Sequence, residues 1–249
     1  MSRFFVPSEN IFDDRIVIDG TDVNHIKNVL RHRVGDKLYV SDSSGVEYEC
    51  IINNMSDGEV TLDIVNSKQS ETELGMDVIL FQGLPKKDKM ELIVQKAVEL
   101  GVTEIYPVIN ERTVVKLDDK KAGQKADRWN KISESAAKQS GRMIIPKVHE
   151  PVSYKKALEI AGGLEYVMIP YENADGVGYS AQCITEAVKT RSVGIFIGPE
   201  GGFSRDEVDK AVESGAKVIS LGKRILRTET AGLTTLSIIM FEKEKQSGL

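Results

Sequence analysis

The spacing of apolar residues changes near residue 74, and the two parts of the chain predict different structures. In the first part, short apolar runs predict strands over 37–41 and 46–52, with the turn-forming residues 42–45 between them. Strict alternation of apolar and polar residues over 60–64 predicts another half-buried strand. The first part is therefore expected to be a compact β-rich module.

One helix and one linker complete this module. Apolar residues at helical spacing over 23–30 predict a short amphipathic helix, with Thr21 or Asp22 as its N-cap. The stretch 66–73 contains no apolar residue and is the predicted linker. We therefore place the first domain at residues 1–72 and the second at residues 73–249.

After the linker, short apolar runs alternate with segments of helical spacing. The segment 90–98 places its apolar residues on one face, and Gly101 follows at a typical C′ position. Strands are predicted over 78–81, 105–108, 166–169, 193–197 and 218–221, and helices over 90–98, 124–140, 153–161, 180–189, 204–214 and 229–244. This alternation predicts an α/β domain with a mainly parallel sheet.

Composition narrows the class of protein. Of the 249 residues, 41% are hydrophobic and 29% are charged, which excludes a collagen, a long coiled coil and a disordered chain. Cys50 and Cys183 cannot form a disulfide framework and favour a reduced, cytoplasmic setting. No run approaches the ~18 apolar residues of a membrane span, and the N-terminus lacks the features of a secretory signal.

Charge is distributed unevenly along the chain. Residues 1–73 carry seven Lys and Arg against fourteen Asp and Glu, whereas the remaining residues carry 26 against 24. The segment 112–147 holds ten Lys and Arg with only four acidic residues. This segment is a candidate surface for a polyanion, and a solvated helix face is the alternative.

Ligands of open α/β sheets gather at the carboxyl ends of strands, where three unusual loops are predicted at 82–87, 198–204 and 221–231. The 198–204 loop contains three glycines and a proline around Glu200, so a ligand can approach its main chain closely. Ser204 begins a predicted capping box at its end. The alternative is an ordinary connection between a strand and a helix.

The 221–231 loop brings charge to the start of a predicted apolar helix. Arg224 and Arg227 supply positive charge, and the polar residues 228–230 supply hydrogen-bonding groups. The N-terminus of a helix attracts anionic groups. The alternative is a helix cap, with Thr228 or Thr230 as the N-cap and solvated arginines beside it.

Other catalytic motifs are weak or missing. Residues 176–181 fit a relaxed GxGxxG/A dinucleotide pattern, but they lie too far from the preceding strand for the true fingerprint. The sequence has no GxxxxGK[ST] phosphate loop and no GxSxG elbow. Its three histidines form no HExxH and no zinc spacing, so we expect no metal.

The two later loops carry a family resemblance. The stretches 197–204 and 221–231 are similar to the two signature motifs of the bacterial RsmE family, the 16S ribosomal RNA (uracil-1498-N3)-methyltransferases of the SPOUT superfamily. Supporting similarities lie at 3–6, 25–31, 89–101, 128–129 and 136–142, so the resemblance covers essentially the whole chain in order.

The resemblance implies a fold, a reaction and a partner. The fold is α/β, with a C-terminal trefoil-knotted, SPOUT-like parallel-sheet domain preceded by a small PUA-like β-barrel that helps to hold RNA. The reaction is methylation of N3 of one uridine in 16S rRNA of the small ribosomal subunit, with S-adenosyl-L-methionine as cofactor. A cytoplasmic homodimer packed through the knotted domains is also implied.

Site residues follow from the same resemblance. Arg227 is expected to contact the uracil oxygens or the phosphate, and Glu200 or Glu229 is expected to be the general base, with Arg227 and Glu200 ranked first. The expected cofactor-binding residues are Gly83, Leu84, Ile197, Gly198, Pro199, Gly201, Gly202, Leu221, Gly222, Ile225, Leu226, Thr230 and Ala231. The expected RNA-binding residues are Arg3, Arg31, Arg33, Lys116, Arg128, Lys138 and Arg142.

Three other functions stay open at this point. An enzyme of the same fold could methylate a ribose 2′-hydroxyl, which the product nucleoside would reveal. A non-catalytic RNA-binding factor for ribosome assembly would keep only a vestigial pocket. A nucleotide-dependent dehydrogenase built on residues 176–181 would bind NAD instead.

Overall fold

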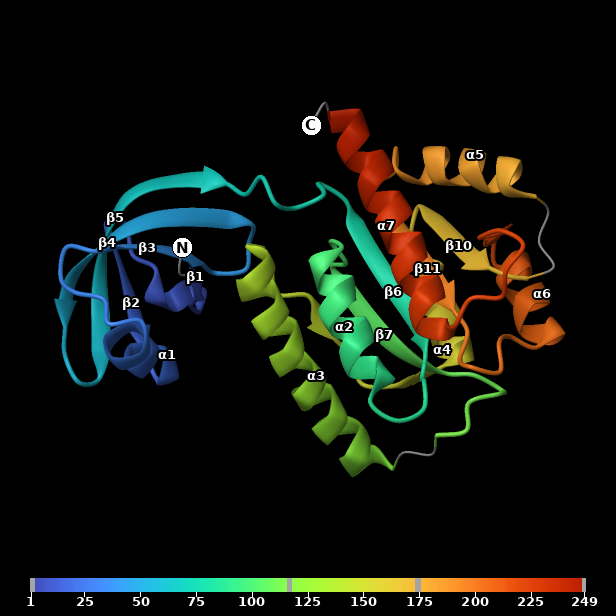
Figure 1. Cartoon of the computed structure of the whole chain (residues 1–249), viewed down its shortest axis with the longest axis horizontal. Helices are drawn as coiled ribbons and strands as arrows, with labels where there is room; N and C mark the ends of the chain where they lie inside the picture. Colours follow the sequence, from blue (N-terminus) through green and yellow to red (C-terminus); the bar gives the residue numbers. More distant parts are fainter. Residues whose placement is uncertain (1–2, 116–117, 173–175, 248–249) are drawn as a thin grey trace. The chain divides into compact units, whose positions relative to one another are not determined.

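The computed structural model describes residues 3–115, 118–172 and 176–247, which form two compact units (Figure 1). The first unit comprises Met1–Glu73 and Ala137–Ile145, and the second comprises Leu74–Ala136 and Pro146–Leu249. The apolar pattern had assigned residues 137–145 to the second domain, whereas their contacts place them in the first unit.

The first unit contains a five-stranded sheet with the order β1-β3-β4-β5-β2. Its strands are β1 (Arg3–Phe5), β2 (Arg15–Asp19), β3 (Lys37–Ser41), β4 (Val46–Met55) and β5 (Glu59–Gln69). Strand β1 pairs with β3 in parallel, and the other neighbouring strands are antiparallel. Ile18, Leu38 and Leu62 are at most 1% exposed, so the alternating positions of these strands form one core, as the sequence predicted.

Two predictions about this unit are wrong. Helix α1 (Thr21–Asn24) begins after Gly20 without a side-chain cap and continues as a π-helix, η2 (His25–Val29), in which the Leu30 N–H donates to the His25 carbonyl. The wider turn rotates the apolar stripe, which leaves Val29 63% exposed.

The predicted linker is the second error. Residues 66–69 belong to β5 and pair with 46–49 of β4. Their side chains are exposed, so backbone hydrogen bonds form this ribbon without the apolar alternation by which a strand is predicted.

The second unit is built on a seven-stranded parallel sheet with the order β12-β10-β11-β6-β7-β8, and β9 also pairs with β7. The strands are β6 (Asp77–Gly83), β7 (Glu104–Ile109), β8 (Lys147–Val148), β9 (Val152–Ser153), β10 (Tyr166–Pro170), β11 (Ser192–Ile197) and β12 (Lys217–Ile219). The helices are α2 (Lys89–Glu99), α3 (Asp119–Ser140), α4 (Tyr154–Ala161), α5 (Val177–Ala187), α6 (Arg205–Glu213) and α7 (Thr228–Ser247). The predicted α/β class is therefore confirmed.

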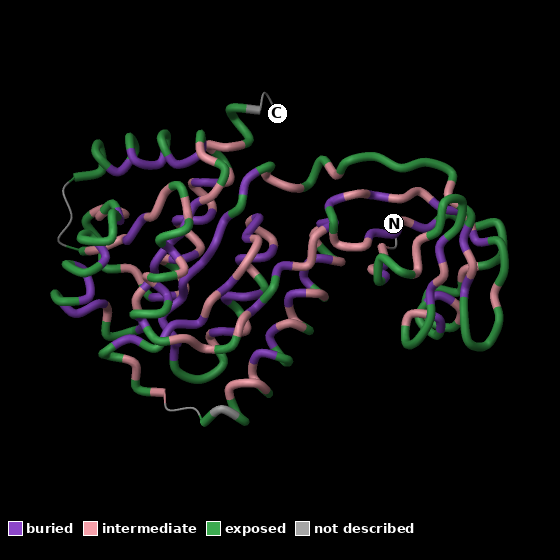
Figure 2. Tube along the Cα trace, turned by 180° about the vertical axis from the view of Figure 1, so that it is seen from behind, coloured by how far each residue is buried: buried purple, intermediate pink, exposed green. Residues whose placement is uncertain are grey.

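Helices cover both faces of this parallel sheet (Figure 1). Ile79 and Phe81 of β6 share a core with residues of α4 and α6. Because side chains alternate along a strand, the equally buried Val78 and Leu80 point to the opposite face, where α7 packs against α2, α5, β6 and β11. Figure 2 shows these central strands as continuously buried, which is typical of a parallel sheet covered on both sides.

Within the described residues, no helix combines the length and the apolar character needed to cross a membrane. Strand order and pairing do not by themselves define how the chain threads, so the knot stays a prediction.

Candidate active site

A cavity of about 500 Å³ lies at the carboxyl ends of the parallel strands in the second unit. Its walls come from the segments that follow β10, β11 and β12, with the starts of α2 and α7. Twelve of the predicted site residues line it: Ile197, Gly198, Pro199, Glu200, Gly201, Gly202, Leu221, Gly222, Ile225, Leu226, Arg227 and Ala231. The structure thus brings two separate sequence motifs to one cavity.

Residues 198–203 form a glycine loop between β11 and α6. A Cβ on Gly198 would lie 3.1 Å from backbone atoms of Gly202, and Gly202 itself has a φ of +66°. The loop therefore folds tightly on itself, and only glycine fits both positions without strain. Ser204 then caps α6 in a capping box with Glu207, which confirms that prediction.

Gly83 and Leu84 were expected in the cofactor site but do not line the cavity. A Cβ on Gly83 would lie 2.4 Å from the Pro199 nitrogen, so β6 packs directly beneath the glycine loop. Leu84 is 3% exposed, and its N–H donates to the Val108 carbonyl. Gly83 therefore supports the cavity wall from behind, whereas the backbone of Leu84 is bound to β7.

Replacing Gly83 with alanine is therefore expected to destabilise the protein by about 1–3 kcal/mol, because the added methyl group must displace the backbone of the glycine loop. Thermal unfolding would measure the loss. Gly178→Ala in α5 is the matched control, because a Cβ there meets no atom within 4 Å. Equal melting temperatures for the two variants would contradict the packing argument.

A buried polar network fixes the start of α7 against the glycine loop. Gln82 is fully buried, and its Nε2 donates to Thr228 Oγ1 at 2.8 Å. The Thr228 hydroxyl in turn donates to the Gly198 carbonyl at 2.6 Å. Thr228 is the first residue of α7, and its hydroxyl joins three chain segments instead of capping the helix.

Thr230 and Glu229, also in the first turn of α7, do not line the cavity. The Glu229 side chain is 16% exposed and lies beside Lys89, with 3.1 Å between Oε2 and Nζ. Lys89 Nζ also lies 3.3 Å from Oε1 of Glu200. One lysine thus stands between the two carboxylates that were expected to act as bases.

These contacts shift the pKa values of Lys89 and Glu200. The carboxylate of Glu229, followed by that of Glu200, holds the pKa of Lys89 above its usual value. Burial tends to raise the pKa of Glu200, but hydrogen bonds from its own N–H, the Lys86 N–H and Lys89 outweigh it and lower that pKa. Glu200 is therefore a stable anion and a weak proton acceptor.

Several cavity residues escaped the sequence analysis as site residues. Lys89, Arg112, Tyr171 and Thr228 all line the cavity. Arg112 NH1 donates to the Gly201 carbonyl at 2.9 Å, although 89 positions separate the two residues. Lys89 had a usable signal, because it is the first residue of the helix that follows the 82–87 loop. Arg112 had only its place after a predicted strand and at the start of the basic segment 112–147.

Several of the predicted RNA-binding residues are held in ion pairs with acidic side chains. Arg128 pairs with Glu91 at 2.8 Å, Lys138 with Asp22 at 3.4 Å, and Arg3 with Glu47 at 3.2 Å. Arg31 and Arg33 are exposed in the first unit. Lys116 lies outside the described residues.

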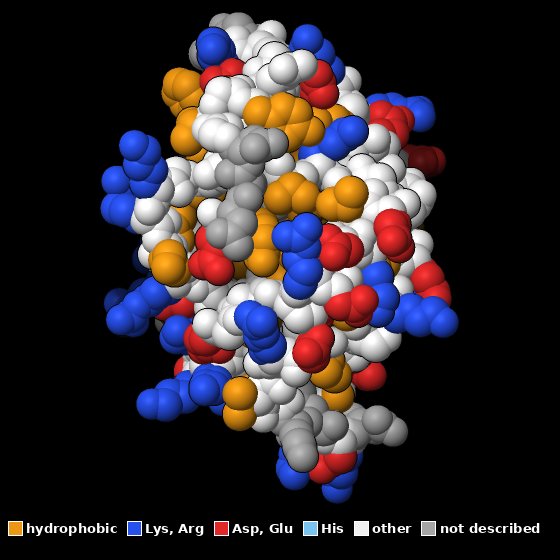
Figure 3. Space-filling model, turned by 90° about the vertical axis from the view of Figure 1, so that its right-hand side faces the viewer, with side chains coloured by type: hydrophobic (Ala, Val, Ile, Leu, Met, Phe, Trp, Pro, Cys, Tyr) orange, Lys and Arg blue, Asp and Glu red, His pale blue; other side chains and the backbone are white. Residues whose placement is uncertain are grey.

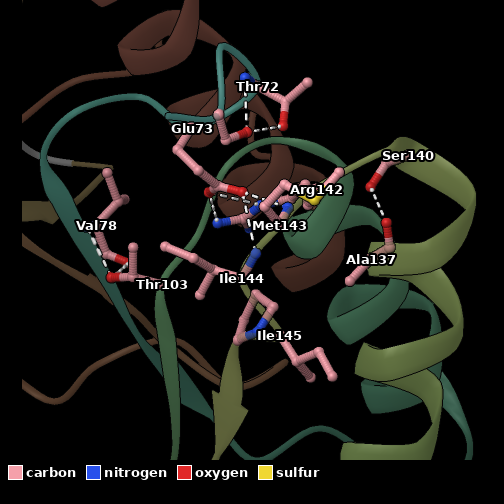
Figure 4. Close-up of polar contacts among 12 residues, drawn as sticks. Thr72, Glu73, Val78, Thr103, Ala137, Ser140, Arg142, Met143, Ile144 and Ile145 are labelled. Carbon is pink, nitrogen blue, oxygen red and sulfur yellow. Dashed lines mark hydrogen bonds and ion pairs between the residues drawn. The ribbon is translucent and has the colours of Figure 1, made fainter. Parts of the chain in front are cut away.

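The prediction that Arg142 contacts RNA is wrong. Its side chain is 3% exposed and binds the Glu73 carboxylate, with Nε at 3.1 Å and NH2 at 2.6 Å (Figure 4). Figure 3 shows another face of the molecule, on which basic and acidic side chains are interspersed. Because charges of both signs alternate on this face, it presents no broad basic surface to a polyanion, and any attraction there would come from small groups of neighbouring basic side chains.

The GxGxxG/A-like motif at residues 176–181 lies apart from this cavity. None of the residues 176–181 lines it, and Gly176 precedes α5 directly. Across the described ranges, no three His, Cys, Asp or Glu side chains gather closely enough to hold a metal ion.

Comparisons with known proteins agree in both units. Residues 72–240 match the family model of the RNA methyltransferase domain, and residues 18–65 match that of the RNA methyltransferase PUA domain. Ribosomal RNA small subunit methyltransferase E of Bacillus subtilis is 37% identical over 93% of this chain and 91% of its own. The protein of the same name from Mesomycoplasma hyopneumoniae is 32% identical over 95% and 98%.

Solved structures lead to the same group. A ribosomal RNA small subunit methyltransferase E from Neisseria gonorrhoeae, bound to S-adenosyl methionine, superposes with a TM-score of 0.83 at 30% identity and covers 97% of both chains. A putative methyltransferase from Legionella pneumophila, in complex with the cofactor SAM, gives a TM-score of 0.81 at 30% identity and covers 96% of both.

Proposed function

Because this chain belongs to the ribosomal RNA small subunit methyltransferase E family, we propose that it transfers a methyl group from S-adenosylmethionine to N3 of one uridine in 16S ribosomal RNA. The observation that carries the proposal is the cavity at the carboxyl ends of the parallel strands, where both signature loops meet. That cavity lies within the unit matched by the RNA methyltransferase domain.

The residues of the cavity fit this cofactor. A volume of about 500 Å³ is within the range of small-molecule sites. Gly222, with a φ of +107° and no atom near a Cβ position, leaves room beside the backbone groups of Leu221 and Leu226 for a flat adenine ring. When bound, the cofactor supplies an electrophilic methyl group on a positively charged sulfonium. The ionised Glu200 at the cavity wall favours that charge electrostatically.

The chain's own residues then prepare the uridine. Methylation at N3 requires loss of the N3 proton, which leaves negative charge on the flanking oxygens. Arg227 is exposed on the cavity wall, and Lys89 stays protonated. We assign these two cations to stabilise the uridine anion, so that its N3–H ionises more readily and the N3 proton passes to solvent water before methyl transfer. Glu200 then serves the cofactor rather than acting as the base, and Glu229 holds Lys89 in place.

This mechanism predicts the pH dependence of the reaction. The lowered pKa of Glu200 keeps its charge until the pH falls below the normal carboxylate range, and the raised pKa of Lys89 keeps its charge until the pH rises above the normal lysine range. Between about pH 6 and pH 9, the single-turnover rate is therefore expected to rise steadily with the ionisation of uridine. A rate that instead levels off within this range in the wild type, but not in Glu200→Gln, would identify Glu200 as the base.

The first unit supplies candidates for holding the RNA. It contains the region matched by the PUA domain, where Arg31 and Arg33 are exposed. Arg31 has a φ of +57°, a conformation that non-glycine residues seldom adopt outside functional or tightly turned segments. We propose that this segment contacts RNA phosphates, which makes affinity depend on salt.

The proposed homodimer and location follow from the same assignment. Leu92 of α2 and Phe241 of α7 are 45% and 64% exposed, and these two helices pack against each other. We propose that these two exposed apolar side chains, on helices that pack together, contact a second copy of the chain. Because the proposed substrate is ribosomal RNA, we propose that the protein acts in the cytoplasm.

Transfer of labelled methyl groups to small ribosomal subunits from a strain that lacks this protein tests the proposal. Mass spectrometry of the product nucleosides is expected to find N3-methyluridine. A ribose-methylated nucleoside would overturn the base specificity and retain the methyltransferase. No transfer and no cofactor binding would favour the non-catalytic RNA-binding alternative, and thermal protection by the cofactor measures that binding separately.

A further inference from the structure

The carboxylate of Glu207 joins two loops at the edge of the cavity. Glu207 is 5% exposed, and its Oε2 accepts the Ser204 N–H at 2.9 Å as part of the capping box. Its Oε1 accepts hydrogen bonds from Asn110 Nδ2 and from the Glu111 N–H, each at 3.0 Å. The two hydrogen bonds that Oε1 accepts have no part in capping α6.

These contacts span the sheet. Asn110 and Glu111 follow β7, whereas the glycine loop follows β11, and β6 lies between those strands. Glu207 therefore holds the 110–112 segment across β6 against the glycine loop. A buried carboxylate is strongly penalised without such donors, so the arrangement is well defined.

Arg112 is the residue that this arrangement delivers to the cavity. Its NH1 donates to the Gly201 carbonyl at 2.9 Å, and its Cβ would lie 3.0 Å from a Cβ on Gly201. The guanidinium is exposed on the cavity wall and forms no ion pair with any described residue. Lys89, by contrast, already faces two carboxylates.

We propose that Arg112 binds the carboxylate of the amino-acid part of the methyl donor, and that Glu207 is the residue that positions Arg112 for this contact. The proposal rests on the proposed function. A guanidinium presents several N–H donors in a fixed plane that matches a carboxylate, and one of them is already anchored to the glycine loop. Arg224 and Arg227 belong instead to the loop after β12.

Two ligands that differ in the amino-acid part test this assignment. S-adenosylhomocysteine carries the carboxylate, and 5′-methylthioadenosine lacks the whole amino-acid part. By calorimetry, Arg112→Ala is expected to weaken S-adenosylhomocysteine binding by about 10- to 100-fold and to leave methylthioadenosine within about twofold. Arg205→Ala removes an exposed arginine of α6 outside the cavity, and it should change neither affinity.

Failure of this inference is distinct from failure of the proposed function. Wild-type protein that binds neither ligand would overturn both. If the wild type binds both ligands and Arg112→Ala leaves both affinities unchanged, or weakens both equally, only the role of Arg112 is overturned. An Arg112→Ala variant with normal ligand affinities and weaker binding of ribosomal subunits would assign Arg112 to RNA phosphate instead.

A double-mutant cycle tests the part played by Glu207. Glu207→Gln is expected to weaken S-adenosylhomocysteine binding in the wild-type background and to add little in the Arg112→Ala background. Ser204→Ala is the control, because it removes the helix cap and keeps the Asn110 contact. If Glu207→Gln does not fold, Asn110→Ala takes its place in the cycle. Fully additive losses would show that Glu207 does not act through Arg112.

Discussion

Replacing Arg227 with alanine is expected to lower the single-turnover rate of methyl transfer by about 100- to 1,000-fold, the range seen when one donor to a developing anion is removed. Affinity for the methyl donor should change little. Arg227 lies on the cavity wall one residue before α7, where the helix N-terminus adds to the positive potential. The side chain is therefore placed to stabilise charge that appears only when the uridine loses its N3 proton.

Two comparisons isolate this effect. Arg227→Lys keeps the charge but loses the planar donor set, so an intermediate rate is expected. Arg205→Ala, in α6 and outside the cavity, should react like the wild type. If Arg227→Ala abolished cofactor binding and left turnover per bound cofactor unchanged, Arg227 would be a cofactor residue and the assignment would be wrong.

Replacing Arg142 with leucine is expected to destabilise the first unit by about 3–5 kcal/mol, the usual cost of leaving one partner of a buried ion pair alone. Arg142 places two nitrogens on Oε2 of Glu73, and the N–H groups of Met143 and Ile144 donate to Oε1 (Figure 4). The Glu73 side chain is 13% exposed, so water replaces little of the lost guanidinium.

Denaturant unfolding followed by circular dichroism would measure this loss. Lys156→Ala breaks an exposed pair with Glu159 and should cost no more than about 1 kcal/mol. Replacing Arg142 with leucine and Glu73 with glutamine together should restore part of the stability, because no charge is then left without its partner and the amide oxygen can still accept the Met143 and Ile144 N–H groups. A single Arg142→Leu variant as stable as Lys156→Ala would show that the pair contributes little.

Arg142 is also an example of a contact that the sequence alone did not predict. Arg142 lies in a basic stretch, and charge counted along the chain cannot reveal a partner 69 positions away. Apolar periodicity did predict five of the seven strands of the parallel sheet, because their side chains are buried, but it missed the two-residue strands β8 and β9. It missed residues 66–69 of β5, which pair through backbone atoms alone, and it gave no sign of the π-helix that exposes Val29.

For the cavity too, some features were predicted from the sequence and others were not. The two signature loops meet there as expected, since the carboxyl ends of parallel strands share one edge of the sheet. Gly83 and Leu84 were assigned to the cavity because their loop follows a strand, but Pro199 covers Gly83. Lys89 and Arg112 matter through contacts with distant residues, which one sequence does not display.

Because residues 137–145 belong to the first unit, that unit cannot finish folding during synthesis until they have been made. An N-terminal domain that is contiguous in sequence can fold as soon as it leaves the ribosome. Here Glu73 cannot pair with Arg142, and Ser41 cannot donate to the Met143 carbonyl, until residues 142 and 143 have been synthesised. At about 5–20 residues per second, that wait is roughly 4 to 15 seconds. Strands β6 and β7 emerge in the meantime, so the first unit is completed only after part of the second has already left the ribosome.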